Sequence, residues 1–186
     1  MLILGINGSP HKGGMCDRLL AQALQGSLHE GAEVDYLHLV DHIRTFPDGE
    51  LSDRIPPELE ELILRIEAAD GIIVATPVHW FNVSALTKAL IDFLSATEYR
   101  GFSLEGKALG ALASCEEDGG AQALSLIALP LLHLGFLIPP YSLVFHNRNM
   151  ADKSEDRWQE RDPWLVGANV VRLARLAGKR GWNDGR

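Results

Sequence analysis

The chain has 186 residues, a length that suits one domain with a sizeable buried core. Its composition, 46% hydrophobic and 23% charged, is ordinary for a globular protein, and the net charge of -8 argues against a general nucleic-acid binder, whose affinity depends on neutralising phosphates. Only two cysteines occur, Cys16 and Cys115, far apart in the sequence, which argues against a disulfide scaffold or a zinc ribbon.

The first half of the chain alternates apolar runs with helical patterns. The runs predict strands at residues 2–7, 33–39 and 71–76, and the helical spacing of leucine and isoleucine predicts helices at 15–29 and 58–69. The third of these strands is continuously apolar, which is typical of a strand buried on both faces. Residues 40–57 contain three prolines and one glycine, so a loop is expected there.

The second half continues the alternation. Ser84 is a good N-cap for a helix that runs to Leu94. Further strands are predicted at 107–115 and 136–145, the latter interrupted at Pro139 and Pro140, and a helix at 120–134 that Pro130 should kink. A polar surface loop is expected over 147–162, followed by an N-cap at Asp162, a first-turn proline at Pro163 and a last helix over 166–176.

Strands and helices in alternation predict an α/β fold with a parallel sheet covered on both faces. Ligands of such sheets bind outside the carboxyl ends of the strands, where the strand order reverses. With the order 2-1-3-4-5 this switch point lies between the first and third strands. Three loops meet there, at residues 8–16, 77–83 and 114–120, and all three contain unusual combinations of small, aromatic and polar residues.

The first of these loops is suited to a phosphate group. It joins a strand to a helix, so unpaired N–H groups and the positive end of the helix dipole face it, and its glycines let an anion approach the backbone. Gly8 and Gly13 have the spacing of a P-loop, but Gly14 and Met15 stand where Lys and Ser or Thr are required. Asn7 likewise breaks the dinucleotide fingerprint. One terminal phosphate, as in a mononucleotide, remains the expected ligand.

Two segments resemble the flavodoxin-like, NAD(P)H-dependent FMN reductases. Residues 8–16 (GSPHKGGMC), followed by Leu19 and Leu20, are similar to the phosphate loop of that family. Residues 76–92 (TPVHWFNVSALTKALID) are similar to its second flavin loop and the helix behind it. The order and separation of these features match from residue 2 to about residue 145. The resemblance implies a single flavodoxin-like domain over 1–186, a three-layer sandwich around a five-stranded parallel sheet of order 2-1-3-4-5.

The same resemblance implies a site for FMN, bound without a covalent link. The first loop would line the phosphate, the second would hold the isoalloxazine ring, and the third would approach its other edge. The family commonly has Arg, Asn, Thr and Tyr where this chain has His11, Met15, Cys16 and His79, so Ser9 and the backbone amides would have more of the phosphate to bind. The implied cofactor-binding residues are Ser9, His11, Gly14, Met15, Cys16, Pro77, Val78, His79, Trp80, Phe81, Ser114 and Gly119.

The implied function is hydride transfer from NADPH or NADH, as a transient donor, through FMN to a small acceptor such as a quinone or a free flavin. No catalytic side chain is assigned. Family resemblance suggests a homodimer or a homotetramer. The alternatives are a flavodoxin-type electron carrier and a non-catalytic flavodoxin-like binding protein. Iron–sulfur flavoproteins share the fold, but their compact cysteine cluster is absent, so no cluster is expected.

Several residues keep two interpretations. His79 is either a flavin neighbour or an exposed loop histidine, and Cys16 is either a low-pKa thiol at a helix N-terminus or an inert small residue. The apolar cluster within residues 127–134 is either deep core or an oligomer face. No metal site is expected. Without a signal peptide or an apolar stretch long enough to span a bilayer, we expect a cytoplasmic protein.

Overall fold

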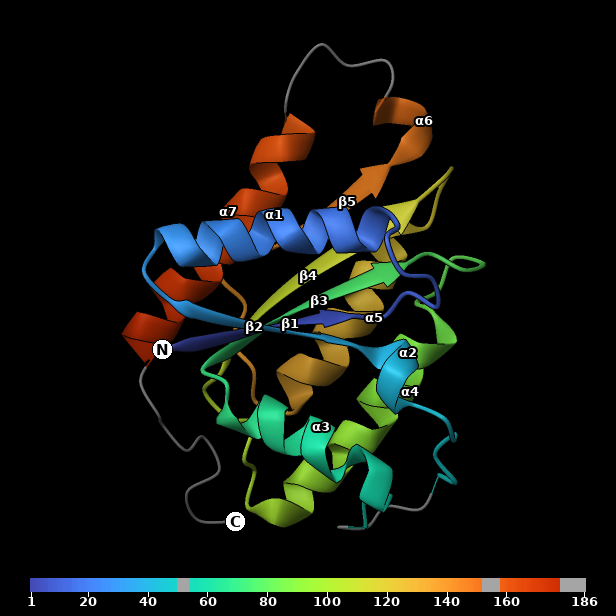
Figure 1. The fold of residues 1–186 in the computed structure, drawn as a ribbon, viewed down its shortest axis with the longest axis vertical. Coiled ribbons are helices and arrows are strands. Elements are labelled where there is room, and N and C mark those ends of the chain that lie inside the picture. Colours follow the sequence, from blue (N-terminus) through green and yellow to red (C-terminus); the bar gives the residue numbers. More distant parts are fainter. Residues whose placement is uncertain (50–53, 152–157, 178–186) are drawn as a thin grey trace.

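A computed structural model describes residues 1–49, 54–151 and 158–177 (Figure 1). Its sheet has five parallel strands in the order β2-β1-β3-β4-β5, which confirms the predicted topology. The strands are β1 (Leu2–Asn7), β2 (Glu33–His38), β3 (Gly71–Pro77), β4 (Ala108–Cys115) and β5 (Leu143–Asn147). All five therefore end at the same edge, and the loops that follow them meet there.

Helices cover both faces of the sheet and make three layers. One layer contains α1 (Met15–His29) and α7 (Trp158–Ala177), and the other contains α3 (Pro57–Ala68), α4 (Ala85–Leu94) and α5 (Gly120–His133) (Figure 1). Shorter elements complete the chain: α2 (Leu39–His42), α6 (Arg148–Ala151) and a 3-10 helix, η1 (Ser95–Arg100).

The central strand β3 shows why its sequence is apolar throughout. Side chains of a strand alternate between faces, and in β3 they enter two separate cores. Ile72 and Val74 pack among the residues beneath α3, α4 and α5, whereas Ile73 and Ala75 pack beneath α1 and α7. A strand with both faces buried has no position left for a polar side chain until it reaches the edge of the sheet.

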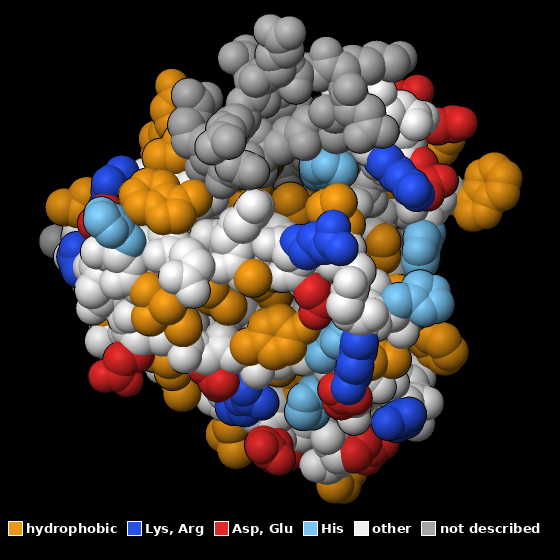
Figure 2. All heavy atoms as spheres, turned by 45° about the horizontal axis from the view of Figure 1, so that its top comes forward, with side chains coloured by type: hydrophobic (Ala, Val, Ile, Leu, Met, Phe, Trp, Pro, Cys, Tyr) orange, Lys and Arg blue, Asp and Glu red, His pale blue; other side chains and the backbone are white. Residues whose placement is uncertain are grey.

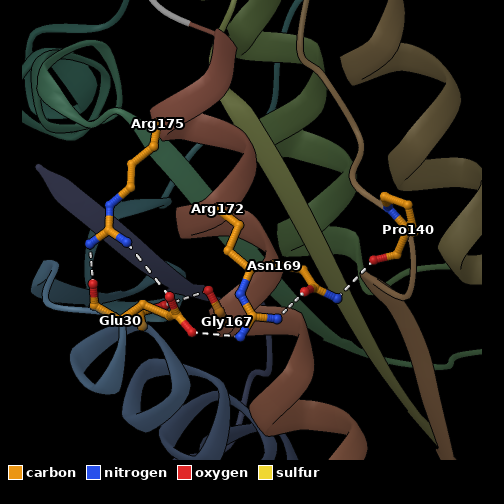
Figure 3. A network of polar contacts seen from close by, with 7 residues as sticks. Glu30, Pro140, Gly167, Asn169, Arg172 and Arg175 are labelled. Carbon is orange, nitrogen blue, oxygen red and sulfur yellow. Dashed lines mark hydrogen bonds and ion pairs between the residues drawn. The ribbon is translucent and has the colours of Figure 1, made fainter.

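Helices α1 and α7 are held together by close backbone contact and by ion pairs and hydrogen bonds around Glu30. A Cβ added to Gly167 would lie 1.7 Å from the carbonyl oxygen of Ala23, so only glycine allows this approach. Figure 3 shows the polar contacts beside it: the Glu30 carboxylate accepts from Arg172 at 2.7 Å, and Arg175 donates to the Glu30 carbonyl oxygen. Arg172 in turn donates to the Asn169 side chain at 3.0 Å.

The structure corrects several predicted boundaries. The expected loop after β2 begins with the short helix α2, and the strand expected over 136–145 is confined to β5, preceded by one bridge between Leu137 and Ala108. Residues 50–53 and 152–157 lie outside the described part of the chain. The expected polar loop over 147–162 contains α6 and the start of α7.

Helix α7 begins earlier than the sequence predicted, and the apolar residues of α5 are only partly buried. Helix α7 begins at Trp158, so Pro163 lies inside it instead of in its first turn. Packing against α1 and the sheet stabilises α7 and outweighs the lost hydrogen bond. The apolar cluster of α5 is divided between core and surface, since Ile127 and Leu131 are buried while Leu129 and Leu132 are exposed.

Candidate functional site

The loops after β1 and β3 are joined by a buried polar cluster. Ser84 donates its hydroxyl hydrogen to the carbonyl oxygen of Gly8 at 2.5 Å and accepts from the N–H of Thr87, which confirms Ser84 as the N-cap of α4. Thr87 and Thr76 are also joined through their hydroxyls at 3.1 Å. A Cβ on Gly8 would lie 1.9 Å from Thr87 Oγ1, so glycine is required for the two loops to meet.

The base of the first loop is held by buried side chains. Ser9 is buried, its N–H donates to Asn7 Oδ1 at 2.9 Å, and its carbonyl oxygen lies 2.7 Å from His38 Nε2. The Ser9 hydroxyl accepts from the N–H of His11 at 3.1 Å, while the His11 side chain is exposed. The loop is therefore fixed from below, and its outer side faces solvent.

An acidic residue occupies the start of α1. The carboxylate of Asp17 accepts from the N–H of Gly14 at 3.0 Å and from the hydroxyl of Tyr36 at 2.8 Å, which caps the helix from within. Burial and the hydrogen bond to Asp17 raise the pKa of Tyr36 to about 12. Tyr36 therefore remains a neutral donor to Asp17 at physiological pH.

Cys16 does not present a reactive thiol to the loop. Its side chain is buried in the core beneath α1, and burial, with a smaller effect of Asp17, raises the pKa of the thiol to about 12. The inert interpretation of this residue is therefore the one the structure supports. Of the groups of Cys16, its backbone N–H is the one that could bind an anion at the start of the helix.

The loops after β3 and β4 enclose a hollow of about 630 Å³, which we call the aromatic hollow. Its walls are residues 77–81 on one side and 114–118 on the other. The predicted residues Pro77, Val78, His79, Trp80, Phe81 and Ser114 are all brought together here. A volume of this size accommodates a planar ring system of a cofactor or substrate.

The aromatic wall is a tight hairpin with an unusual sequence. His79 and Asn82 exchange backbone hydrogen bonds of 2.9 and 3.0 Å, and the two residues between them, Trp80 and Phe81, have φ of 51° and 61°. Bulky side chains disfavour such positive φ values, which usually select Asn or Gly at a turn of this kind. The turn holds Trp80 95% exposed at the mouth of the hollow.

Hydrogen bonds within this loop leave few backbone donors available. The N–H of Val78 donates to Ser114 at 2.8 Å, and those of His79 and Asn82 are used within the hairpin. Within the described residues, the N–H groups of Trp80 and Phe81 have no acceptor. These two N–H groups are neutral donors that this wall of the hollow offers to a ligand.

The opposite wall is acidic and is held by a residue that the sequence did not indicate. Glu116, Glu117 and Asp118 are all exposed on the loop after β4. The Asn147 side chain donates to the carbonyl oxygen of Glu117 and accepts from the N–H of Asn149, which fixes this loop to the end of β5. Gly119 follows with φ of 90° and begins α5 as its N-cap.

A second hollow of about 340 Å³, which we call the basic hollow, adjoins the first. The residues it shares with the aromatic hollow are Ser114, Cys115 and Glu116. Its other walls are Gly13, Gly14, Met15 and Arg18 of the first loop and α1, and His146 and Arg148 at the end of β5. Sequence reasoning predicted Gly14 and Met15 but missed both arginines, because neither lies in a recognisable motif.

Of the residues predicted to bind the phosphate, only some line a hollow in the described part of the chain. Across the described chain, the walls of these two hollows do not include Ser9, His11 or Cys16. The remaining donors of the first loop still suit a phosphate: the N–H groups of Lys12, Gly13, Met15 and Cys16 have no acceptor in the described residues. A set of backbone donors beside a ring-sized hollow fits the expected FMN.

This edge of the molecule carries charges of both signs. Figure 2 shows histidine, basic and acidic side chains interspersed along its right-hand side, where Figure 1 places the carboxyl ends of the strands. None of the helices in the described ranges combines the length and apolar character needed to cross a membrane.

Comparisons with known proteins show the family of this chain. The family described as NADPH-dependent FMN reductase matches residues 1–149. The chain is 33% identical over 129 residues to an iron–sulfur flavoprotein of Methanosarcina thermophila, covering 66% of this chain and 67% of that protein. It is 31% identical over 153 residues to an iron–sulfur flavoprotein of Methanocaldococcus jannaschii, covering 79% and 77%.

A solved structure extends the likeness to the whole fold. RosB with a bound 8-demethyl-8-formylriboflavin-5'-phosphate superposes with a TM-score of 0.76 at 20% identity, covering 95% of this chain and 79% of that one. At this identity the likeness concerns the fold. It agrees with the flavodoxin-like sandwich of order 2-1-3-4-5.

Proposed function

This chain belongs to the NADPH-dependent FMN reductase family, and we propose from that membership that it passes a hydride from NADPH or NADH through FMN to a small acceptor, such as a quinone or a free flavin. The cofactor of the family is FMN, and NAD(P)H is its electron donor. The observation that carries the proposal is the ring-sized aromatic hollow beside a loop rich in unpaired backbone donors.

FMN supplies the hydride-carrying chemistry when it is bound. The protein contributes binding and orientation. The N–H groups of Gly13, Met15 and Cys16 would bind the phosphate at the positive end of α1. Ser9 supports them from below, since its hydroxyl and carbonyl groups hold the loop in shape.

The aromatic hollow would hold the ring and the reacting partner. The N–H groups of Trp80 and Phe81 would donate to the ring edge and stay neutral, so they can stabilise negative charge that develops there. The exposed faces of these two side chains would bind a planar acceptor by stacking and exclude water from it. His79 is exposed beside them and is proposed as a neighbour of the acceptor.

The iron–sulfur relatives raise the question of a cluster in this chain. Clusters of the common types are held by four cysteine thiolates, whereas this sequence contains two cysteines. Both are buried, and burial raises the pKa of each thiol. We therefore propose that flavin is the redox group of this chain.

The experiment is a visible spectrum of the purified protein with FMN, followed by anaerobic addition of NADPH or NADH. We expect quenching of flavin fluorescence on binding, bleaching of the flavin band by a nicotinamide, and recovery of the band when a quinone is added. Binding without bleaching would indicate a flavodoxin-type carrier. Failure to bind FMN would contradict the proposal altogether.

Self-association is proposed through the exposed face of α5. Leu126, Leu129 and Leu132 lie one turn apart and are 39%, 66% and 52% exposed. Apolar surface of this kind is stabilised by burial against a second copy. We expect a homodimer or a homotetramer by light scattering, and Leu129→Glu should shift it towards the monomer. A wild-type monomer would contradict this.

A further inference from the structure

The basic hollow contains two arginines that the flavin site described above does not use. Arg18 lies one turn into α1, and Arg148 follows β5 directly. Across the described ranges, Arg18 forms no ion pair or hydrogen bond through its guanidinium. Its positive charge is therefore available to a ligand in the hollow.

Arg148 is engaged only weakly. It lies 3.0 Å from Glu116, but the two side chains are 71% and 78% exposed. Ion pairs with this exposure contribute little stability, because water solvates both partners well. A phosphate group can therefore replace Glu116 as the partner of Arg148 at small cost.

The cation inside the first loop is not available in the same way. Lys12 contacts both carboxylate oxygens of Asp41 at 2.7 Å, and this contact holds the pKa of Asp41 below its usual range. The position at which the family commonly has arginine is His11, whose side chain is exposed. Among the described residues that line the two hollows, Arg18 and Arg148 are the arginines, and no lysine is among them.

The backbone between these arginines is open to an anion. A Cβ added to Gly13 or Gly14 would meet nothing within 4 Å, so the glycine backbone is uncovered on that side. The N–H groups of Gly13 and Met15 have no acceptor in the described residues. Backbone donors, two guanidiniums and a hollow of about 340 Å³ together make a site for a phosphate group.

We infer that the basic hollow binds a phosphate group of a nucleotide, and that Arg18, with Arg148, supplies the positive charge that residue 11 supplies in relatives with arginine there. This inference rests on the proposed function. The phosphate belongs either to FMN or to the nicotinamide dinucleotide, and the chemistry of recognition is the same for both. The planar guanidinium gives two parallel donors to phosphate oxygens, which an ammonium group cannot reproduce.

The test compares Arg18→Gln and Arg148→Gln with the matched control Arg44→Gln, which removes the same charge from an exposed side chain outside both hollows. Dissociation constants for FMN and riboflavin are measured by flavin fluorescence, and KM for NADPH and NADH at saturating FMN. We expect Arg18→Gln to weaken the binding of one phosphate-bearing ligand about ten-fold and Arg148→Gln to weaken it less. Arg18→Lys should weaken it less than Arg18→Gln, because lysine keeps the positive charge. Arg44→Gln should stay within about two-fold of the wild type, because an exposed charge outside both hollows is largely screened by salt.

The pattern of losses identifies the source of the phosphate. Weaker FMN binding with unchanged riboflavin binding assigns the hollow to the FMN phosphate. A higher KM for the dinucleotide with unchanged FMN binding assigns it to the donor. Equal losses for FMN and riboflavin, or values for both Arg18→Gln and Arg148→Gln within two-fold of the wild type, would overturn the inference.

A separate measurement keeps this inference distinct from the proposed function. Line broadening of inorganic phosphate in ³¹P spectra is recorded with the wild type and with Arg18→Gln, in the absence of any flavin. Broadening that Arg18→Gln abolishes supports the phosphate site even if the wild type fails to oxidise NAD(P)H. Identical spectra for the two proteins would count against the site even if the enzyme is active.

Discussion

The two hollows adjoin at the same edge of the sheet and differ in almost every other respect. The aromatic hollow is walled by Trp80 and Phe81 and by the acidic residues 116–118. The basic hollow is walled by glycines, Arg18 and Arg148. They share Ser114, Cys115 and Glu116, so the end of β4 and the start of the loop after it separate a surface suited to a ring from one suited to an anion.

This difference indicates how a nucleotide would be oriented. Its phosphate is favoured by the cations of one hollow and repelled by the carboxylates of the other, and its ring is favoured by the aromatic surface. The orientation would then follow from charge as well as shape. It also means that the two hollows can be altered separately, except through the residues that fix both.

The largest effect is expected from Gly8→Ala, which should disturb both hollows together. The new Cβ would lie 1.9 Å from Thr87 Oγ1 and 3.2 Å from the carbonyl oxygen of Ala75, so the loops after β1 and β3 must separate. We expect a loss of about 3 kcal/mol in the free energy of unfolding, as is usual for overpacking. Urea denaturation measures this loss, and flavin fluorescence should show weaker FMN binding.

Gly14→Ala is the matched control for that variant. It adds the same methyl group to the same loop, but no atom lies within 4 Å of the new Cβ. The expected change is about 0.5 kcal/mol, because alanine is a poorer N-cap than glycine. Equal losses for the two variants would show that the close approach at Gly8 does not hold the loops together.

The second effect concerns the aromatic hollow alone. Replacing Trp80 and Phe81 by Asn and Gly gives the hairpin the residues that its positive φ values favour. We expect the free energy of unfolding to rise by about 1 kcal/mol, while the rate of quinone reduction falls about ten-fold for lack of a stacking surface. Tyr99→Ala removes an exposed aromatic side chain outside both hollows and should change neither. A faster or unchanged rate of quinone reduction would show that Trp80 and Phe81 do not bind the acceptor.

A smaller effect should sharpen the electrostatic side of the comparison. Glu117→Gln with Asp118→Asn removes two exposed charges from the aromatic hollow. We expect KM for a sulfonated quinone to fall about three-fold and KM for an uncharged quinone to stay unchanged, with the difference disappearing in high salt. Glu61→Gln removes one exposed charge from α3 and serves as the control. An equal change for both quinones would exclude a charge effect.

The smallest effect on binding is expected at Cys16, which sequence reasoning placed among the phosphate residues. Cys16→Ala keeps the backbone N–H, so FMN affinity should stay within about two-fold, while the lost packing costs about 1 kcal/mol of stability. The thiol should also react with Ellman's reagent only after unfolding, since its pKa is raised to about 12. Rapid reaction of the folded protein at pH 8 would contradict its burial.

The raised thiol pKa also gives a pH dependence with a defined sign. The folded pKa of about 12 exceeds the ordinary value of 9.0, so folding favours the neutral thiol. Its contribution to stability is complete below about pH 9 and is lost as the pH rises towards 12. Urea denaturation should therefore show the wild type losing stability relative to Cys16→Ala as the pH is raised over this range.

The local sequence was enough to predict several helices and strands and the meeting of two loops. The boundaries of β1, α1 and α4 were predicted correctly because apolar periodicity and the N-cap at Ser84 are properties of neighbouring residues. Loop composition likewise predicted that residues 77–81 would meet Ser114, since parallel strands end at one edge. Helix α7 was misplaced because its extent depends on contact with α1, which lies more than a hundred residues away.

The sequence predicted the α/β fold through its hydrophobic periodicity, and the resemblance of two of its segments to a known family implied the strand order. The edge at which we propose that a ligand binds follows from the parallel strands, which all end there. Only the tertiary structure decided which side chains face that edge. It turned the Cys16 thiol into the core, paired Lys12 with Asp41 and brought Arg18 to Arg148 across the sheet. The physical reason is that burial and charge pairing depend on residues distant in the chain, whereas periodicity depends on near neighbours.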